Sequence, residues 1–120
     1  MKSMGFCLTN FTTTSDAMAQ FDIYRNLSRD TEVAYLLQVQ SNRFDRTQGR
    51  VVVALRHRRA NAPPDHASTP HLTVLGTPVF VDTLDIVALP ARRLGAPVAF
   101  LPEADHSGII TAIDELISRA

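Results

Sequence analysis

Short apolar runs separated by polar turns dominate the chain and predict a series of β-strands. Residues 20–24 alternate polar and apolar side chains, as expected of a strand with one buried face. Residues 50–55 are apolar on both faces, which favours a central strand. A hairpin through the turn Gly76–Thr77–Pro78 is expected to join two of the remaining strands. The other predicted strands are 33–39, 72–75, 79–81, 84–89 and 98–101.

The end of the chain carries the one convincing helical pattern. Its apolar residues fall on one face at helical spacing, and Asp105 or Ser107 can cap its start. These apolar residues are Ile109, Ile110, Ile113, Leu116 and Ile117. A run of strands followed by one helix predicts a mostly β protein: a small antiparallel barrel or sandwich over about Gln20–Leu101, with a helix from about Ser107 to Ser118 packed on it.

The helix also predicts a homodimer, because it offers more apolar surface than one small barrel covers. The interface residues expected from this reasoning are Ile109, Ile113, Leu116 and Ile117.

Composition narrows the function classes. Twelve basic residues balance twelve acidic ones, so overall charge gives no case for direct nucleic-acid or membrane binding. No apolar run approaches the roughly 20 residues of a membrane span. Cys7 is the single cysteine and the four histidines are scattered, so no metal site or cofactor is predicted, and a cytoplasmic location is expected. Residues 1–18 are predicted to be a disordered extension ahead of a domain at 19–120, with Met1 and Met18 as alternative starts.

The densest basic cluster is Arg-His-Arg-Arg at residues 56–59, at the start of a long loop with three prolines. Such a cluster can grip phosphate or an acidic protein segment, although a run of charges is more often a solvated face.

Three groups of segments resemble the CcdB family of toxins from bacterial type II toxin–antitoxin pairs. No single segment is highly specific, but their order and spacing extend over nearly the whole chain from Gln20 onward. The segments are residues 20–24; residues 37–41 with 49–55; and residues 72–76 with 85–90 and Ala112, Ile113 and Leu116.

The resemblance implies an SH3-like β-barrel, which MazF-like toxins share, a homodimer built partly on the terminal helix, and a CcdA-like antitoxin partner. It also implies poisoning of DNA gyrase by contact with the A subunit, which is not enzyme catalysis. The gyrase-binding positions that it suggests are Ser41, Arg43, Phe44, Asp114, Ser118, Arg119 and Ala120. An acidic antitoxin segment would suit Arg56, Arg58 and Arg59.

Two alternatives stay open. The best-known family member ends in Trp-Gly-Ile, whereas this chain ends in Ser118-Arg119-Ala120 and has no tryptophan, which favours a non-toxic or retargeted relative. A MazF-like endoribonuclease is the third candidate. His71, Asp85 and the arginines supply suitable residue types for that chemistry, but no spacing brings them together, and no catalytic residue is predicted.

Overall fold

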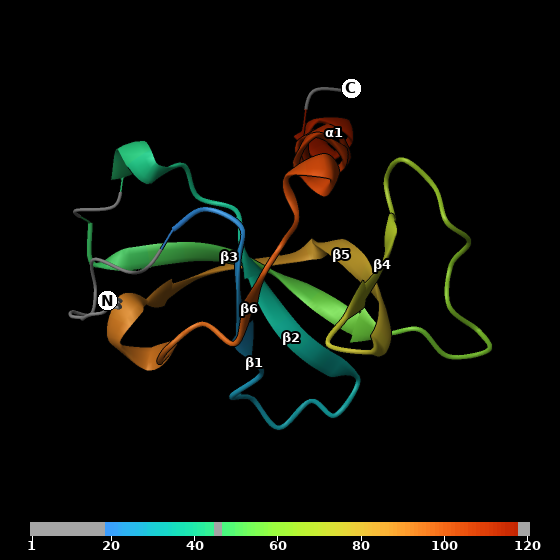
Figure 1. Cartoon of the computed structure of the whole chain (residues 1–120), viewed down its shortest axis with the longest axis horizontal. Helices are drawn as coiled ribbons and strands as arrows, with labels where there is room; N and C mark the ends of the chain where they lie inside the picture. The colour runs from blue at the N-terminus through green and yellow to red at the C-terminus, as the bar shows by residue number, and fades with distance from the viewer. Residues whose placement is uncertain (1–18, 45–46, 118–120) are drawn as a thin grey trace, which may run out of the picture.

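A computed structural model describes residues 19–44 and 47–117. The predicted extension at 1–18 lies outside the described residues, as do Ser118, Arg119 and Ala120. The described chain forms one antiparallel sheet of six strands, curled into a nearly closed barrel in the order β4-β5-β3-β2-β1-β6, with a helix at its C-terminal end (Figure 1). The strands are β1 (Asp22–Arg25), β2 (Val33–Gln38), β3 (Gly49–His57), β4 (His71–Val74), β5 (Thr77–Pro90) and β6 (Ala99–Phe100). The mostly β barrel with one C-terminal helix is therefore confirmed.

Strand β3 is central, as its two apolar faces predicted. It pairs with β2 on one side and β5 on the other, and its residues from Val52 to Leu55 are almost completely buried.

Strand β5 corrects the sequence prediction of separate strands at 79–81 and 84–89. It is a single strand of 14 residues that pairs with β3 in two registers. Ala54 lies opposite Asp82, whereas the preceding Val53 lies opposite Ile86, so residues 83–85 of β5 form a bulge. The polar residues Asp82 and Thr83 thus interrupt the apolar pattern without ending the strand.

Two apolar clusters cover the two faces of the sheet. The interior of the barrel contains Ile23, Leu37 and Leu55, which are at most 2% exposed. A second cluster on the outer face contains Tyr24 and Leu94. The prediction that the first strand is half-buried was wrong, because the connection after β5 brings Leu94 over its other face.

The hairpin between β4 and β5 is confirmed, but its turn lies earlier than predicted. Val74 pairs with Thr77, which leaves Leu75 and Gly76 as the two loop residues. Their φ angles are 50° and 83°, and two positive φ angles are typical of the type I′ turn that suits the twist of a hairpin. The strand therefore reverses before Thr77 and Pro78, which belong to β5.

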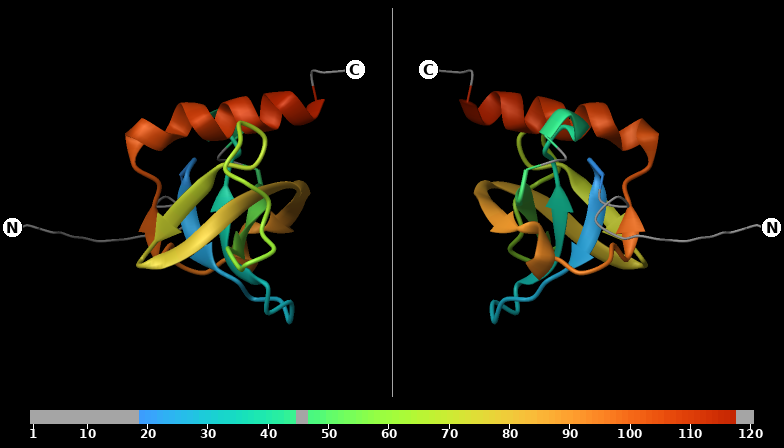
Figure 2. Two further views of the ribbon diagram at one scale, coloured as in Figure 1. Left: turned by 90° about the vertical axis from the view of Figure 1, so that its right-hand side faces the viewer. Right: turned by 90° about the vertical axis from the view of Figure 1, so that its left-hand side faces the viewer.

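The helix α1 (His106–Ile117) follows a short 3-10 turn, η4 (Glu103–Asp105), and lies across one end of the barrel (Figure 2). It begins one residue before the predicted start. Ile109 and Ala112 are its buried residues, and Ile109 belongs to the interior cluster of the barrel. His106 stacks on Phe21, the residue just before β1, with ring centroids 4.0 Å apart, and this contact links the first turn of the helix to the barrel. None of the helices in the described part of the chain is long and apolar enough to cross a membrane.

Candidate protein-interaction site

The first candidate surface is the turn after β2, where η2 (Asn42–Phe44) forms a single 3-10 turn. Ser41 Oγ accepts a hydrogen bond from Arg43 N at 3.2 Å, and Ser41 O accepts one from Phe44 N at 3.0 Å. Thr47 Oγ1 donates to Phe44 O at 2.7 Å and closes the turn. The Phe44 side chain is 57% exposed. The turn presents an aromatic ring and the exposed Arg43 to a partner.

The second candidate surface is the exposed face of α1. Asp114 lies on this face, next to the exposed Ile110 and Ile117. Helix α1 and η2 lie at the same end of the barrel (Figures 1 and 2). The fold therefore brings Ser41, Arg43 and Phe44 to the same end of the molecule as Asp114, although more than 60 residues separate them in the sequence.

The proposed dimer residues on α1 differ in their environment. Ile109 is 1% exposed within a single chain and Ile113 packs partly against the same core. Leu116 is 37% and Ile117 is 72% exposed, so these two leave apolar surface uncovered.

Within the basic cluster, Arg56 is neutralised by the chain's own carboxylates. Its guanidinium bonds Asp82 at 2.9 Å, Asp85 at 3.0 Å and Asp30 at 3.3 Å. Burial alone would lower the pKa of Arg56, but the three aspartates outweigh it and raise the pKa above its ordinary value. Arg59 Nε likewise bonds Glu32 Oε1 at 2.8 Å. Arg56 therefore serves the fold, and the carboxylate partners of both arginines leave little free charge for an acidic partner.

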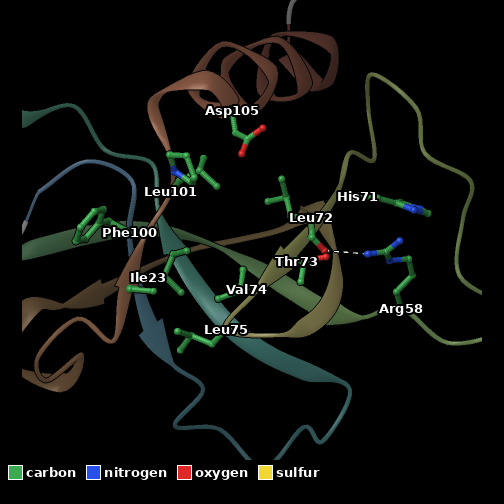
Figure 3. Close-up of a pocket in the computed structure, with 12 residues that line it drawn as sticks. Ile23, Arg58, His71, Leu72, Thr73, Val74, Leu75, Phe100, Leu101 and Asp105 are labelled. Carbon is green, nitrogen blue, oxygen red and sulfur yellow. Dashed lines mark hydrogen bonds between the residues drawn. The ribbon is translucent and has the colours of Figure 1, made fainter.

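Arg58 differs from Arg56 and Arg59 because it has no carboxylate partner among the described residues. Its Nη2 donates to Leu72 O at 3.0 Å. It lines a cavity of about 480 Å³ between β4 and β6, together with His71, Val74, Phe100 and Asp105 (Figure 3). Of the three predicted antitoxin-binding arginines, Arg58 is thus the one placed to meet a ligand.

The structure does not bring His71 together with Asp85, the two residues considered for ribonuclease chemistry, although His71 lines the same cavity as Arg58 and Asp105. His71 Nε2 lies 2.7 Å from Pro63 O, and Asp85 is bound to Arg56. No group of three His, Cys, Asp or Glu side chains in the described residues is arranged to hold a metal ion.

A buried polar cluster on the outer face of the sheet was missed by sequence reasoning. It consists of Asp22, Tyr24, Gln38 and Arg50, each at most 8% exposed. Tyr24 OH donates to Gln38 Oε1 at 3.3 Å, and Asp22 Oδ2 accepts from Ala19 N at 2.9 Å. Burial raises the pKa of Asp22, and burial together with the charge of Asp22 raises the pKa of Tyr24. A signal was present in the polar members of otherwise apolar strands, but the burial of Tyr24 depends on Leu94, far along the chain.

A family model described as CcdB protein matches residues 20–118. No sequence among the curated proteins matches. Among solved structures, an endoribonuclease from Mycobacterial species is 20% identical with a TM-score of 0.66, over 85% of this chain and 92% of that one. An endoribonuclease in complex with its cognate antitoxin, also from Mycobacterial species, is 20% identical with a TM-score of 0.69, over 87% and 98%. The Mycobacterium tuberculosis toxin MazF-mt6 is 13% identical with a TM-score of 0.62, over 82% and 96%. At these identities the three structures establish a shared fold.

Proposed function

This chain belongs to the CcdB family, and on that premise we propose that it is the toxin of a type II toxin–antitoxin pair that inhibits DNA gyrase by contact with the A subunit. The family match over residues 20–118 carries the proposal. The proposed activity is protein binding rather than catalysis, with a CcdA-like antitoxin as the second partner and the cytoplasm as the location.

The end of the barrel that bears η2 and α1 is the proposed gyrase surface. Exposed aromatic and arginine side chains are frequent hot spots of protein interfaces, and Phe44 and Arg43 supply both on one short turn. Ser41 holds that turn in shape, and Asp114 adds a carboxylate on the helix. Ser118, Arg119 and Ala120 extend the proposed surface past the described end of the helix.

A homodimer is the proposed assembly, with Leu116 and Ile117 at its centre. Ile113 would pack between these residues and the core of the barrel, and Ile109 would hold the helix in place through its burial in that core. Sedimentation should show a dimer at micromolar concentration, and Ile117→Asp should shift it toward monomer because it puts a charge into an apolar contact. A wild-type monomer mass at that concentration would contradict the assembly.

The gyrase assay tests the function directly. We expect purified protein, added to gyrase and plasmid DNA, to cause accumulation of cleaved DNA, and induced expression to arrest growth. Phe44→Ala should weaken the effect about tenfold or more, as for an interface hot spot. Leu27→Ala is the matched control, because Leu27 is 62% exposed on the β1–β2 loop at the other end of the barrel (Figure 1). Gyrase that turns over normally in the presence of the protein would refute the proposed target.

The C-terminal tail has its own test. Ser118→Trp combined with Arg119→Gly and Ala120→Ile should strengthen the gyrase effect, because it restores the terminal residues of the best-known family member. If the triple change leaves gyrase binding unaltered, the tail is not the site in this protein.

Two other functions give different outcomes in the same experiment. An endoribonuclease is favoured by the fold that this chain shares with the two mycobacterial endoribonucleases, and it would arrest growth with degraded RNA and intact gyrase turnover. A non-toxic or retargeted relative is favoured by the absence of tryptophan, and it would bind antitoxin without inhibiting gyrase.

A further inference from the structure

The barrel is open along one line, between the two edge strands of its sheet. The strand order ends with β4 on one side and β6 on the other. Residues of both strands line the same cavity of about 480 Å³, so the two edges face each other across it (Figure 3). We call this opening the β4–β6 seam.

The β4 edge presents backbone groups to the seam. His71 N donates to Asp65 Oδ1 at 3.1 Å, which shows that the backbone of His71 points away from β5. In an antiparallel pair this direction alternates, so Thr73 also points its N–H and C=O away from β5. Thr73 lies opposite Pro78, which has no N–H to donate. The N–H and C=O of Thr73 are therefore available to another strand.

The β6 edge is arranged in the same way. Leu101 N donates to Phe21 O at 2.9 Å on the side of β1. The preceding Phe100 is paired with Asp22, and by the same alternation its N–H and C=O point away from β1 and into the seam.

The side chains around the seam are mostly apolar, and their polar members are Arg58, His71, Thr73 and Asp105. The buried Ile23, Val74 and Leu101 form part of its lining, while Leu75 is 65% and Phe100 is 76% exposed. Arg58 lies beside β4, whereas Asp105 lies below α1 (Figure 3). Arg58 Nη2 donates one hydrogen bond to Leu72 O. The buried Nε of Arg58 has no hydrogen-bond partner among the described residues.

We propose that an extended acidic segment of the antitoxin binds in the β4–β6 seam as an added strand, with its apolar side chains on Val74 and Leu101 and a carboxylate on Arg58. Strand addition of this kind pairs backbone groups on an exposed sheet edge, and the pockets beside it select alternate side chains. It would also cover an edge that otherwise invites aggregation. The inference rests on the proposed function for the source of the segment, whereas the site itself follows from the two edges and Arg58.

A synthetic peptide tests the site. The probe is acetyl-Thr-Val-Thr-Val-Asp-Leu-amide, and the comparison peptide has Asn in place of Asp. Amide hydrogen exchange in the intact protein should slow at Thr73 and Phe100 when the probe binds, because their N–H groups would gain backbone partners. Binding without this protection, or no binding at millimolar peptide, would overturn the proposal.

Two matched pairs of variants separate the backbone and charge contributions. Thr73→Pro removes the proposed N–H donor at an edge position that tolerates proline and should abolish protection at Phe100, whereas Thr73→Val retains the donor and should bind as the wild type does. Arg58→Gln should weaken the probe about tenfold through loss of a charge-assisted hydrogen bond, and Arg59→Gln should have no effect. The Asn peptide should bind the wild-type protein about tenfold more weakly than the Asp peptide does. The two peptides should bind the Arg58→Gln variant with equal affinity. Equal binding of both peptides by the wild type would remove Arg58 from the site.

The peptide result is independent of gyrase. Protection of Thr73 and Phe100 in a protein that leaves gyrase unaffected would uphold the seam and refute the proposed target. Gyrase inhibition by a protein whose Thr73 and Phe100 amides stay unprotected would do the reverse. Full neutralisation of the Thr73→Pro variant by the co-expressed antitoxin would refute the seam as the antitoxin site.

Discussion

Ile109→Ala tests whether the terminal helix is anchored by the core of its own barrel. Ile109 is 1% exposed and belongs to the interior cluster. Shortening a buried isoleucine to alanine costs about 2–5 kcal/mol, and the higher helix propensity of alanine returns about 0.5 kcal/mol. We therefore expect a loss of about 3 kcal/mol in the free energy of unfolding. For a domain of this size that corresponds to a fall in Tm of about 12 °C.

The matched control is Ile117→Ala, eight positions further along the same helix. Its side chain is 72% exposed in the single chain, so the intrinsic stability should change by less than about 0.5 kcal/mol. Its effect should instead appear as weaker dimerisation, and thermal unfolding should be followed by circular dichroism at several protein concentrations to separate the two. A fall of less than about 4 °C for Ile109→Ala, or an equal and concentration-dependent fall for both variants, would refute the assignment of Ile109 to the core.

Four further substitutions test the polar interactions and the hairpin. Burial raises the pKa of Asp22 above its ordinary value of 3.8, so the folded state binds its proton more tightly and stability falls as the pH rises through that raised pKa. Asp22→Asn should therefore be more stable than the wild type at pH 7, with the difference vanishing below about pH 4; an unchanged difference across urea titrations from pH 3 to 7 would contradict this. Arg56→Gln should lower the free energy of unfolding by about 1–2 kcal/mol; the loss is no larger because its partners Asp30 and Asp85 are well exposed and contribute little. Arg59→Gln should lower it by less than about 0.5 kcal/mol. The difference in stability between the Arg56→Gln and Arg59→Gln variants should narrow in 1 M NaCl, where the Debye length is about 3 Å. A difference that does not depend on salt would exclude an ionic origin. Leu75→Asn should stabilise the protein by about 0.5–1 kcal/mol, because asparagine adopts the positive φ of this turn more readily; a lower Tm would show that Leu75 makes apolar contacts worth more than its backbone strain.

The sequence predicted those elements whose environment is set locally. The continuous apolar run of β3 indicated a strand buried on both faces, and the helical spacing from Ile109 onward indicated a helix packed on the barrel. Both predictions depend on periodicity alone, and both were confirmed.

What the sequence could not predict depends on contacts between distant segments. The continuity of β5 past Asp82 depends on Arg56, which lies on the neighbouring strand and binds Asp82 just before the bulge and Asp85 within it. The burial of Tyr24 depends on the connection that carries Leu94 across the outer face. The candidate surface was likewise only partly predictable. The polar composition of 41–44 indicated a turn, but the exposure of Phe44 depends on how the described segments pack around it, which a local pattern does not report.

The bulge in β5 allows the number of residues between the two paired parts of this strand to change without altering the pairing of either part. In a regular strand, adding or removing one residue turns every later side chain to the opposite face of the sheet. Residues 83–85 are not paired with β3 through the backbone, and separate sets of backbone pairs fix the strand before and after them. A length change confined to this stretch would therefore leave Val79 and Val81 inside the barrel, and the pairing of Ile86 with Val53 intact. One end of the barrel can thus change its loops while the other end keeps its register.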